Sequence, residues 1–217
     1  MIKKDILFDL DDTIVKLNGS KEIAVNLTLN FFINKNNLLN FSKDYIRNAR
    51  LRYDERDIFK LIKLILIEFN IDVSLEKIKD KFLSMYKDVA LKNEKLMIDE
   101  KVLKKLNEKY NLTIITNRPR IFFDIIWKDR LKPYFQNVVC FDDYENIPRK
   151  PNFLIITNAI EKLNLNAEFY VGNEEHDILA SNGANLKCIL VSNEKREYSV
   201  KPTYIFDNIN EIEKIFL

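Results

Sequence analysis

The sequence is short of glycine, cysteine and histidine, with three, two and one of them among 217 residues. The two cysteines, Cys140 and Cys188, lie in separate apolar runs and lack the spacing of metal ligands. This excludes a disulfide scaffold, and we expect two buried, reduced thiols in a cytoplasmic protein. Because glycine is so rare, each glycine marks a position of interest.

The chain also lacks a strong net charge and a long hydrophobic run. Lys and Arg number 35 against 33 Asp and Glu, and a net charge of +2 gives no field suited to nucleic acid. The longest apolar stretch, 61–69, contains Lys63 and Glu68 and is too short to cross a bilayer. Charged residues at 3–5 interrupt any apolar N-terminal segment, so we expect no signal peptide. With 47% hydrophobic residues, the chain can fill a sizeable core in one large domain or in a core with a smaller lobe.

What the chain does contain, near its start, is a cluster of acids after a short apolar run. Residues 6–8 suit a buried strand, and Asp9, Asp11 and Asp12 follow at once. Burying one carboxylate there costs on the order of several kcal/mol unless a cation, a metal or hydrogen bonds compensate. The acids either lie solvated in a turn or form a site that recruits a cation. If the extended geometry persists, Asp9 and Asp11 face the same pocket, since alternate strand residues share a face.

The segment that follows this stretch is predicted to be entirely helical. Ile23, Leu27 and Phe31 recur every four residues, and further apolar stripes follow as far as position 89. We expect all of these stripes to pack in a core. Ser20 and Ser74 are predicted N-caps.

After about position 93, strands alternate with helices. The predicted strands are 112–115, 137–141, 169–171, 188–192 and 204–206, and the predicted helices are 101–109, 120–131, 152–163 and 178–182. This alternation predicts an α/β fold: a three-layer α/β/α, Rossmann-like core with a mainly parallel sheet that includes the opening strand. Residues 1–15 and 93–217 form this core, and 16–92 form an all-helical insertion.

Polar clusters follow other predicted strands. Thr-Asn-Arg-Pro at 116–119 offers a hydroxyl and backbone amides that suit a phosphate oxygen, or simply opens the next helix. Lys150, before a proline, is either a ligand or a solvated lysine. The turn Gly-Asn-Glu-Glu-His-Asp at 172–177 is rich in oxygen ligands that suit Mg²⁺, or is solvated. Because ligands bind at the carboxyl ends of parallel strands, these clusters are candidates for one site.

The order of these motifs resembles the haloacid dehalogenase-like hydrolase superfamily. A strand ending D-x-D-x-T, a strand ending Thr-Asn, a Lys-Pro and a strand ending G-x-x-x-x-D follow one another, with a helical cap after the first strand. The resemblance covers nearly the whole chain. It implies a cytoplasmic, Mg²⁺-dependent phosphatase that hydrolyses a small phosphorylated metabolite through an aspartyl-phosphate intermediate. Nucleoside monophosphates, phosphoglycolate and sugar phosphates remain open as substrates, and the oligomeric state is open too.

The resemblance also implies a role for each motif residue. Asp9 would be the nucleophile, and Asp11 the general acid for the leaving alcohol and then the base for water. The implied ligands are Thr116, Asn117 and Lys150 for phosphate, and Asp9, the Asp11 carbonyl, Asn173 and Asp177 for Mg²⁺. Thr13 is expected to stabilise the turn, and His176 to be a solvent-exposed bystander.

Asp12 and Asn173 stand at two positions where this chain differs from many or most members of the family. Many relatives carry glycine where this chain has Asp12, although aspartate is also familiar there, and we expect its side chain to point away from the site. The family usually has aspartate where this chain has Asn173, so one negative charge is missing at the metal. We therefore predict an active phosphatase that binds Mg²⁺ weakly, with Asp177 or Glu174 compensating directly or through water.

The same residues bear on three other functions. A 2-haloacid dehalogenase is disfavoured, because those relatives lack the second acid at the Asp11 position. A phosphomutase or another phosphotransferase keeps both acids and stays open. A catalytically impaired relative that binds a phosphorylated ligand or a partner is suggested by Asn173, but the other motif residues are intact.

Substrate choice is assigned to the helical insertion, which would close over the site as a cap. Segments 16–20 and 92–98 are the expected hinges. A cluster of arginines in the insertion either meets a second anionic group of a substrate or forms a solvated face of ion pairs: Arg47, Arg50, Arg52 and Arg56.

Overall fold

The chain folds into two compact units. The computed structural model describes residues 3–33, 41–55, 57–194 and 197–217. One unit, the sheet unit, comprises Met1–Lys16 and Lys95–Leu217, and the other, the helical unit, comprises Leu17–Glu94. Among the residues described, no helix combines the length and the apolar character that crossing a membrane requires.

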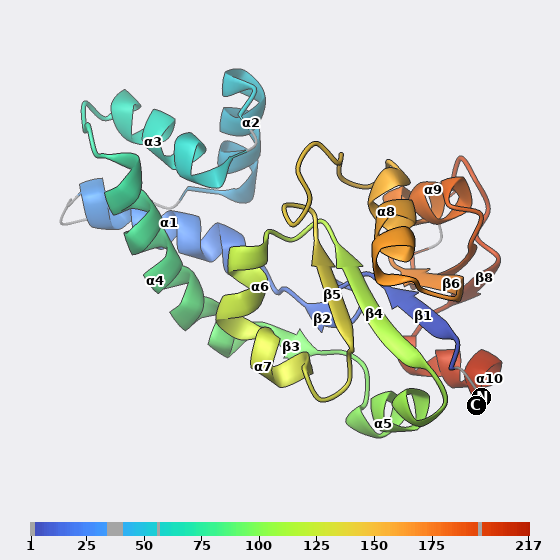
Figure 1. Cartoon of the computed structure of the whole chain (residues 1–217). Coiled ribbons are helices and arrows are strands. Elements are labelled where there is room, and N and C mark those ends of the chain that lie inside the picture. Colours follow the sequence, from blue (N-terminus) through green and yellow to red (C-terminus); the bar gives the residue numbers. More distant parts are fainter. Residues whose placement is uncertain (1–2, 34–40, 56, 195–196) are drawn as a thin grey trace. The chain divides into compact units, whose positions relative to one another are not determined.

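The sheet unit is built on six strands that all run parallel (Figure 1). Their order is β5-β4-β1-β6-β7-β8, so β1 lies between β4 and β6. The strands are β1 (Asp5–Phe8), β4 (Asn111–Thr116), β5 (Asn137–Cys140), β6 (Ala167–Gly172), β7 (Lys187–Val191) and β8 (Tyr204–Phe206). The predicted α/β fold with a mainly parallel sheet is confirmed. The residues after β1 therefore meet the carboxyl ends of a strand on either side.

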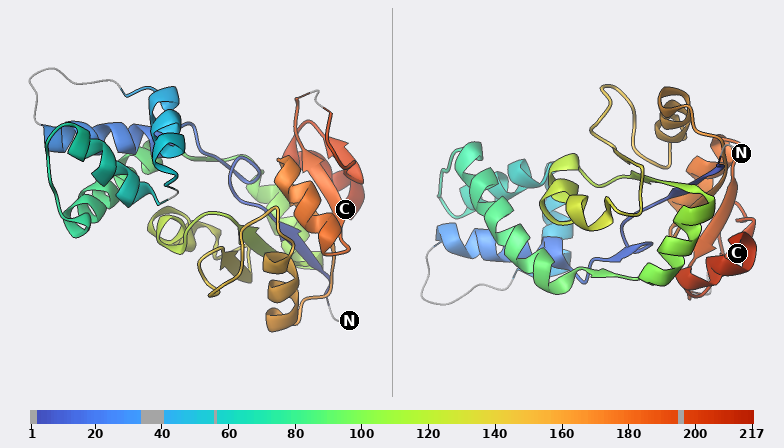
Figure 2. Two further views of the ribbon diagram at one scale, coloured as in Figure 1. Left: turned by 90° about the horizontal axis from the view of Figure 1, so that it is seen from above. Right: turned by 60° about the horizontal axis from the view of Figure 1, so that its bottom comes forward.

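Side chains of β1 alternate between the two faces of the sheet, each covered by helices. Leu7 lies in a buried cluster with Ile115 and Tyr170, under α8 (Leu154–Leu163) and α9 (Glu175–Gly183), drawn in orange in Figure 1. Phe8 faces the other way and meets the ring of Phe135 edge-on at 5.7 Å. On that second face, α5 (Glu100–Lys109) and α10 (Glu213–Phe216) lie next to each other (Figure 2, right).

Two local features of this unit differ from the predictions. The helix predicted over 120–131 is two helices, α6 (Arg120–Ile126) and α7 (Lys128–Leu131), with Trp127 between them. A small antiparallel pair, β2 (Val15–Lys16) with β3 (Lys95–Leu96), was not predicted at all. Strands of two residues are too short to leave a periodic signal in the sequence. The 3₁₀ turn η1 (Ile209–Ile212) precedes α10.

The described part of the helical unit contains helices and no strand, as predicted. The helices are α1 (Ser20–Ile33), α2 (Lys43–Tyr53), α3 (Ile58–Glu68) and α4 (Leu75–Asn93), and α1 packs along α4 (Figure 2). The predicted N-cap at Ser74 is confirmed, since its hydroxyl accepts the Lys77 N–H at 3.4 Å. The one at Ser20 is wrong: Ser20 is the first residue of α1, and its hydroxyl donates to the buried Glu94 at 2.7 Å.

The expected core packing is wrong for one stripe of α1. Ile23, Leu27 and Phe31 are 40%, 39% and 53% exposed. The buried face lies one to two positions further along and contains Ala24, Val25, Thr28, Leu29 and Ile33. Helix α1 is apolar on more than one face, so periodicity alone did not identify the face that packs on α4.

Candidate active site

The loop after β1 forms a tight turn that begins at Asp9. The N–H of Asp9 still pairs with the Val171 carbonyl of β6 at 2.8 Å, and the Leu10 carbonyl then accepts three successive amides of the turn. Asp12 has a φ of 56°, a left-handed conformation that glycine and aspartate tolerate better than most residues. Its carboxylate pairs with Lys16 at 3.2 Å. The turn therefore directs Asp9 inward and ties Asp12 to the chain that leaves the loop.

A buried lysine ammonium occupies the centre of the site. The Nζ atom of Lys150 donates to Asp9 Oδ1 at 2.6 Å, to Asp177 Oδ1 at 2.7 Å and to the Tyr170 hydroxyl at 2.6 Å. The side chains of Lys150 and Asp177 are both 0% exposed, and that of Asp9 is 5% exposed. Tyr170 in turn donates to the Ile115 carbonyl at 2.8 Å. Tyr170 was not predicted as a site residue, because a tyrosine within an apolar strand indicates a side chain that packs in the hydrophobic core.

The charges of this group do not cancel, and the pKa values show where the excess lies. Burial raises the pKa of Asp9 from 3.8 to about 7; Lys150 opposes this rise, and repulsion from Asp177 and Asp11 adds to it. Burial also opposes the charged form of Asp177, but Lys150 and backbone N–H groups hold its pKa below the ordinary value. Although burial lowers it, the pKa of Lys150 lies well above its usual range because of Asp177 and Asp9. Asp9 is thus the carboxylate that lacks a full countercharge.

Backbone amides hold the other carboxylate. Asp177 Oδ2 accepts the N–H groups of Asn173 and Glu174, each at 3.1 Å, while Oδ1 accepts Lys150. Both oxygens therefore have partners within the protein. This close approach requires glycine at 172, because a Cβ there would lie 2.5 Å from the Asp177 side chain.

Thr13 does more than stabilise its turn. Its hydroxyl lies 3.1 Å from Asp9 Oδ2 and 3.0 Å from Asn173 Oδ1. It therefore joins the loop after β1 to the loop after β6. Asp9 and Asn173, both predicted metal ligands, therefore each have one oxygen next to the same hydroxyl group.

Asp11 has a partner that the sequence did not reveal. The guanidinium Nε of Arg118 donates to Asp11 Oδ1 at 2.7 Å, with the arginine side chain 2% exposed and the aspartate 26% exposed. An arginine–carboxylate hydrogen bond of this length is charge-assisted and fixes the orientation of the carboxylate. Arg118 stood in the Thr-Asn-Arg-Pro motif, but nothing local to it pointed to a residue 107 positions earlier.

The two polar residues at the end of β4 have different surroundings. Thr116 is buried, and its hydroxyl accepts the Arg118 N–H at 3.1 Å, which leaves its own hydrogen to donate. The amide of Asn117 is used by the backbone of Lys150: Nδ2 donates to the carbonyl at 3.0 Å, and Oδ1 accepts the N–H at 2.9 Å. Asn117 therefore connects β4 to the segment that carries Lys150.

His176 is half-buried, whereas the sequence predicted it to be solvent-exposed. Its side chain is 36% exposed, and Nε2 lies 3.5 Å from Asp177 Oδ1. Burial lowers its pKa, so the imidazole is neutral at pH 7. It adds no positive charge to the site at that pH.

One of the arginines of the helical unit takes part in a network of its own. Arg52 pairs with Glu68, which also accepts the hydroxyls of Tyr45 and Tyr53. Of the two interpretations of the arginine cluster, Arg52 therefore fits the one in which it belongs to a face of ion pairs. Arg47 and Arg50 are exposed, and Arg56 lies outside the described residues.

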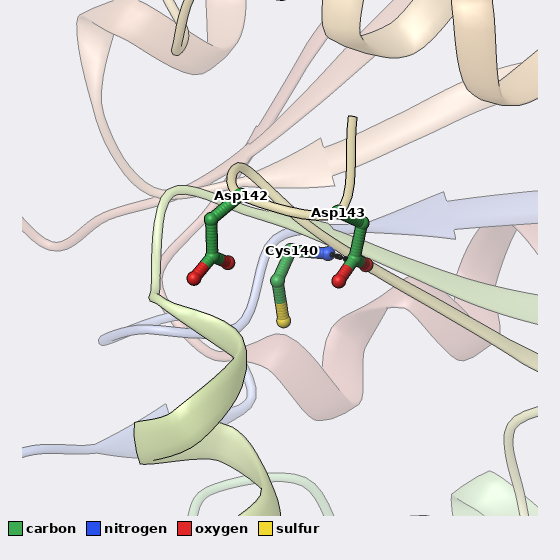
Figure 3. A group of neighbouring side chains, drawn as sticks. All are labelled: Cys140, Asp142 and Asp143. Atoms are coloured by element: carbon green, nitrogen blue, oxygen red, sulfur yellow. Dashed lines mark hydrogen bonds between the residues drawn. The ribbon is translucent and has the colours of Figure 1, made fainter. Parts of the chain in front are cut away.

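A second group of potential metal ligands follows β5. The ligand atoms of Cys140, Asp142 and Asp143 lie within 4.8 Å of one another, and Figure 3 shows the Cys140 N–H directed at Asp143, a bond of 2.7 Å. Arg120 donates its backbone N–H to Asp142 and its Nε to Asp143, each at 2.8 Å. Burial raises the pKa of the Cys140 thiol to about 12, so it stays neutral. Arg120 supplies the countercharge, and the group acts as a clamp between β5 and α6.

The donor set around Asp9 fits a hard divalent cation. Asp9 Oδ2 and Asn173 Oδ1 are oxygen donors beside one hydroxyl, and Lys150 and its two carboxylates carry a net negative charge when Asp9 is ionised. A cation there would offset the burial and the repulsion that together raise the Asp9 pKa.

Comparison with known proteins identifies the family. The model of the haloacid dehalogenase-like hydrolase family matches residues 6–191. The chain belongs to this family of hydrolases, as its motifs predicted. It is 24% identical over 220 residues to the pyrophosphatase PpaX of Bacillus mycoides, covering 95% of this chain and 94% of PpaX. It is 27% identical over 226 residues to the phosphoglycolate phosphatase of Colwellia psychrerythraea, covering 97% and 95%.

A solved structure agrees on the fold. The HAD-hydrolase YfnB of Bacillus subtilis, described as bound to magnesium, superposes with a TM-score of 0.73 at 18% identity. The match covers 100% of this chain and 99% of YfnB.

The raised pKa of Asp9 makes a prediction for stability. The folded state holds a proton on Asp9 below about pH 7 and the unfolded state only below about pH 4, so stability from this group falls as the pH rises between these values. At pH 8 in EDTA, Asp9→Asn should therefore raise the free energy of unfolding by about 1–3 kcal/mol, and the gain should shrink towards pH 5. Urea unfolding at both pH values measures it.

Asp5→Asn is the matched control. The Asp5 carboxylate, at the other end of β1, accepts the Asn166 N–H at 2.7 Å, so its replacement should not stabilise the protein. An Asp9→Asn protein less stable than wild type at pH 8 in EDTA would contradict this electrostatic account.

Proposed function

We propose that the protein is a Mg²⁺-dependent phosphatase that hydrolyses a small phosphorylated metabolite through an aspartyl-phosphate intermediate. The observation that carries this proposal is the buried Asp9, which contacts Lys150 and yet lacks a full countercharge. A nucleophile of this kind suits a reaction in which a bound metal ion would supply the missing positive charge and offset the negative charge of the incoming phosphate.

The proposed steps use residues that lie together. Asp9 attacks phosphorus, an Asp9–phosphorus bond forms and the bond to the leaving oxygen breaks. Asp11, oriented by Arg118, gives a proton to the leaving oxygen. A water molecule then attacks phosphorus and gives a proton to Asp11, the bond between phosphorus and the Asp9 oxygen breaks, and inorganic phosphate leaves. The Thr116 hydroxyl donates to a phosphate oxygen. The Lys150 ammonium compensates part of the negative charge of Asp9. Asn117 positions Lys150 through hydrogen bonds to its backbone carbonyl and N–H.

Mg²⁺ would be held by Asp9, the Asp11 backbone carbonyl and Asn173, and when bound it would neutralise phosphate charge and orient the substrate. Asp177 was expected among the ligands. Since its two oxygens already accept Lys150 and two backbone amides, we assign it to positioning Lys150, with contact to the metal through water at most.

The names of the relatives support a small substrate whose leaving group is an alcohol or a second phosphate. We assign substrate choice to the helical unit, which would act as a cap. Segments 16–20 and 92–98 would be its hinges. Cytoplasmic location is proposed because both cysteines are buried free thiols.

Turnover of p-nitrophenyl phosphate tests the activity. Wild type should release p-nitrophenolate with Mg²⁺ and not with EDTA, and Asp9→Asn should lose roughly 10³-fold or more in kcat because the nucleophile is removed. Absence of metal-dependent turnover in wild type would favour a ligand-binding role. Turnover that survives Asp9→Asn would contradict the aspartyl-phosphate mechanism.

Asn173 should set the metal affinity. Asn173→Asp adds a negative charge beside Asp9 Oδ2, so the apparent Mg²⁺ affinity, from the Mg²⁺ dependence of turnover and from calorimetry, should rise about tenfold. Asn185→Asp, which adds the same charge at an exposed position, is the control. Equal Mg²⁺ affinities for wild type and Asn173→Asp would remove Asn173 from the ligand set.

Arg118 should matter most where the leaving group needs a proton. In Arg118→Met the buried chain length is kept but Asp11 loses its anchor, so kcat for an alkyl phosphate should fall by about 10–100-fold. With p-nitrophenyl phosphate, whose phenolate leaves without a proton, kcat should fall far less. Arg130→Met, an exposed arginine over Trp127, is the control. An equal loss with both substrates would argue against a role through Asp11.

A further inference from the structure

The hydrogen-bonding capacity of Lys150 is fully used within the protein. A lysine ammonium carries three N–H donors and no acceptor. Its three partners here are Asp9 Oδ1, Asp177 Oδ1 and the Tyr170 hydroxyl, at 2.6–2.7 Å. In this arrangement no N–H of Lys150 is left for a substrate oxygen. Lys150 therefore acts on Asp9 through its charge and its fixed hydrogen bond, and whatever fixes its direction matters.

Two of these partners are alike and the third differs. Asp9 and Asp177 are carboxylates that attract the ammonium from the turn after β1 and from the first turn of α9. The Tyr170 oxygen is neutral and belongs to β6 itself, where Tyr170 pairs in register with Leu7 of β1. An ammonium between two carboxylates is free to shift towards either one, whereas a third acceptor on a rigid strand defines a single position for it.

The Tyr170 hydroxyl is itself fixed from a third strand. It donates its hydrogen to the Ile115 carbonyl of β4 at 2.8 Å, so the lone pairs remain for Lys150. The ring lies in the buried apolar cluster with Leu7 and Ile115. A phenylalanine would fill that cluster equally well. The hydroxyl is thus a polar group placed in the core where it has two partners, and one of them is the lysine of the site.

We propose that Tyr170 is a positioning residue: its hydroxyl, held by the Ile115 carbonyl, takes the third N–H of Lys150 and thereby fixes the ammonium on both Asp9 and Asp177. The catalytic consequence rests on the proposed function, because it assumes that Asp9 is the nucleophile. The contact between Tyr170 and Lys150 does not depend on that function, so it can be tested separately.

Tyr170→Phe is the decisive variant, because it keeps the ring and removes only the oxygen. Its control is Tyr110→Phe in the same unit, whose hydroxyl contacts the Phe216 carbonyl at 3.5 Å, away from the site. The first measurement is NMR of protein labelled with ¹⁵N-lysine. Wild type should show one ammonium signal that exchanges slowly with water and that is lost in Lys150→Arg. In Tyr170→Phe this signal should exchange about tenfold faster or disappear, and in Tyr110→Phe it should be unchanged.

The second measurement is turnover of p-nitrophenyl phosphate with Mg²⁺. Tyr170→Phe should lower kcat about 5- to 30-fold with KM within about threefold of wild type, because the loss lies in the orientation of the nucleophile's partner and not in substrate binding. A purely structural role would lower the thermal stability and leave kcat per folded molecule unchanged.

The outcomes separate cleanly. A faster-exchanging ammonium together with a lower kcat supports the proposal. An unchanged ammonium signal in Tyr170→Phe overturns it, whatever happens to kcat, and so does an unchanged kcat with an altered signal. A wild-type protein without turnover refutes the proposed function, and the ammonium signal then decides by itself whether Tyr170 fixes Lys150.

Discussion

The structure of the site depends on one buried cation whose partners come from two distant parts of the chain, the turn after β1 and the segment from β6 to α9. Lys150 lies between Asp9, Asp177 and Tyr170, and its removal would leave two buried carboxylates without their shared cation, a loss that typically costs about 3–5 kcal/mol. The surrounding fold can be understood as the means of bringing these groups together. The parallel sheet aligns the carboxyl ends of β1, β4 and β6, glycine at 172 admits the Asp177 carboxylate, and Asn117 holds the lysine backbone.

This arrangement leaves excess negative charge at Asp9, the residue that the proposed chemistry uses as its nucleophile. One ammonium faces two buried carboxylates, and burial raises the pKa of Asp9 to about 7. A core selected only for stability would have a neutral residue at this position. The imbalance instead makes the site receptive to positive charge. Asn173 moderates it, because an aspartate there would add a further negative charge beside Asp9.

Much of the fold was predictable because its signals are local. Apolar runs of three to six residues alternating with helical patterns predict a parallel sheet, and the strands lie within one or two residues of their predicted bounds. The errors have local causes too. The pair β2–β3 is too short for periodicity to detect, and α1 offers two apolar faces, of which Leu29 lies on the buried one and Leu27 on the exposed one.

For the site, residue types and their spacing predicted which side chains gather at the strand ends: Asp9 and Asp11 after β1, Thr116 at the end of β4 and Asn117 after it, and Asn173 and Asp177 after β6. Residue type and spacing carry that information because they act along the chain. The partners of these side chains follow from the three-dimensional fold: Arg118 for Asp11, the Lys150 backbone for Asn117, and Tyr170 for the Lys150 ammonium. Each of these bonds joins segments at least 20 residues apart, and a hydrogen bond depends on distance and direction in space, which sequence spacing does not record.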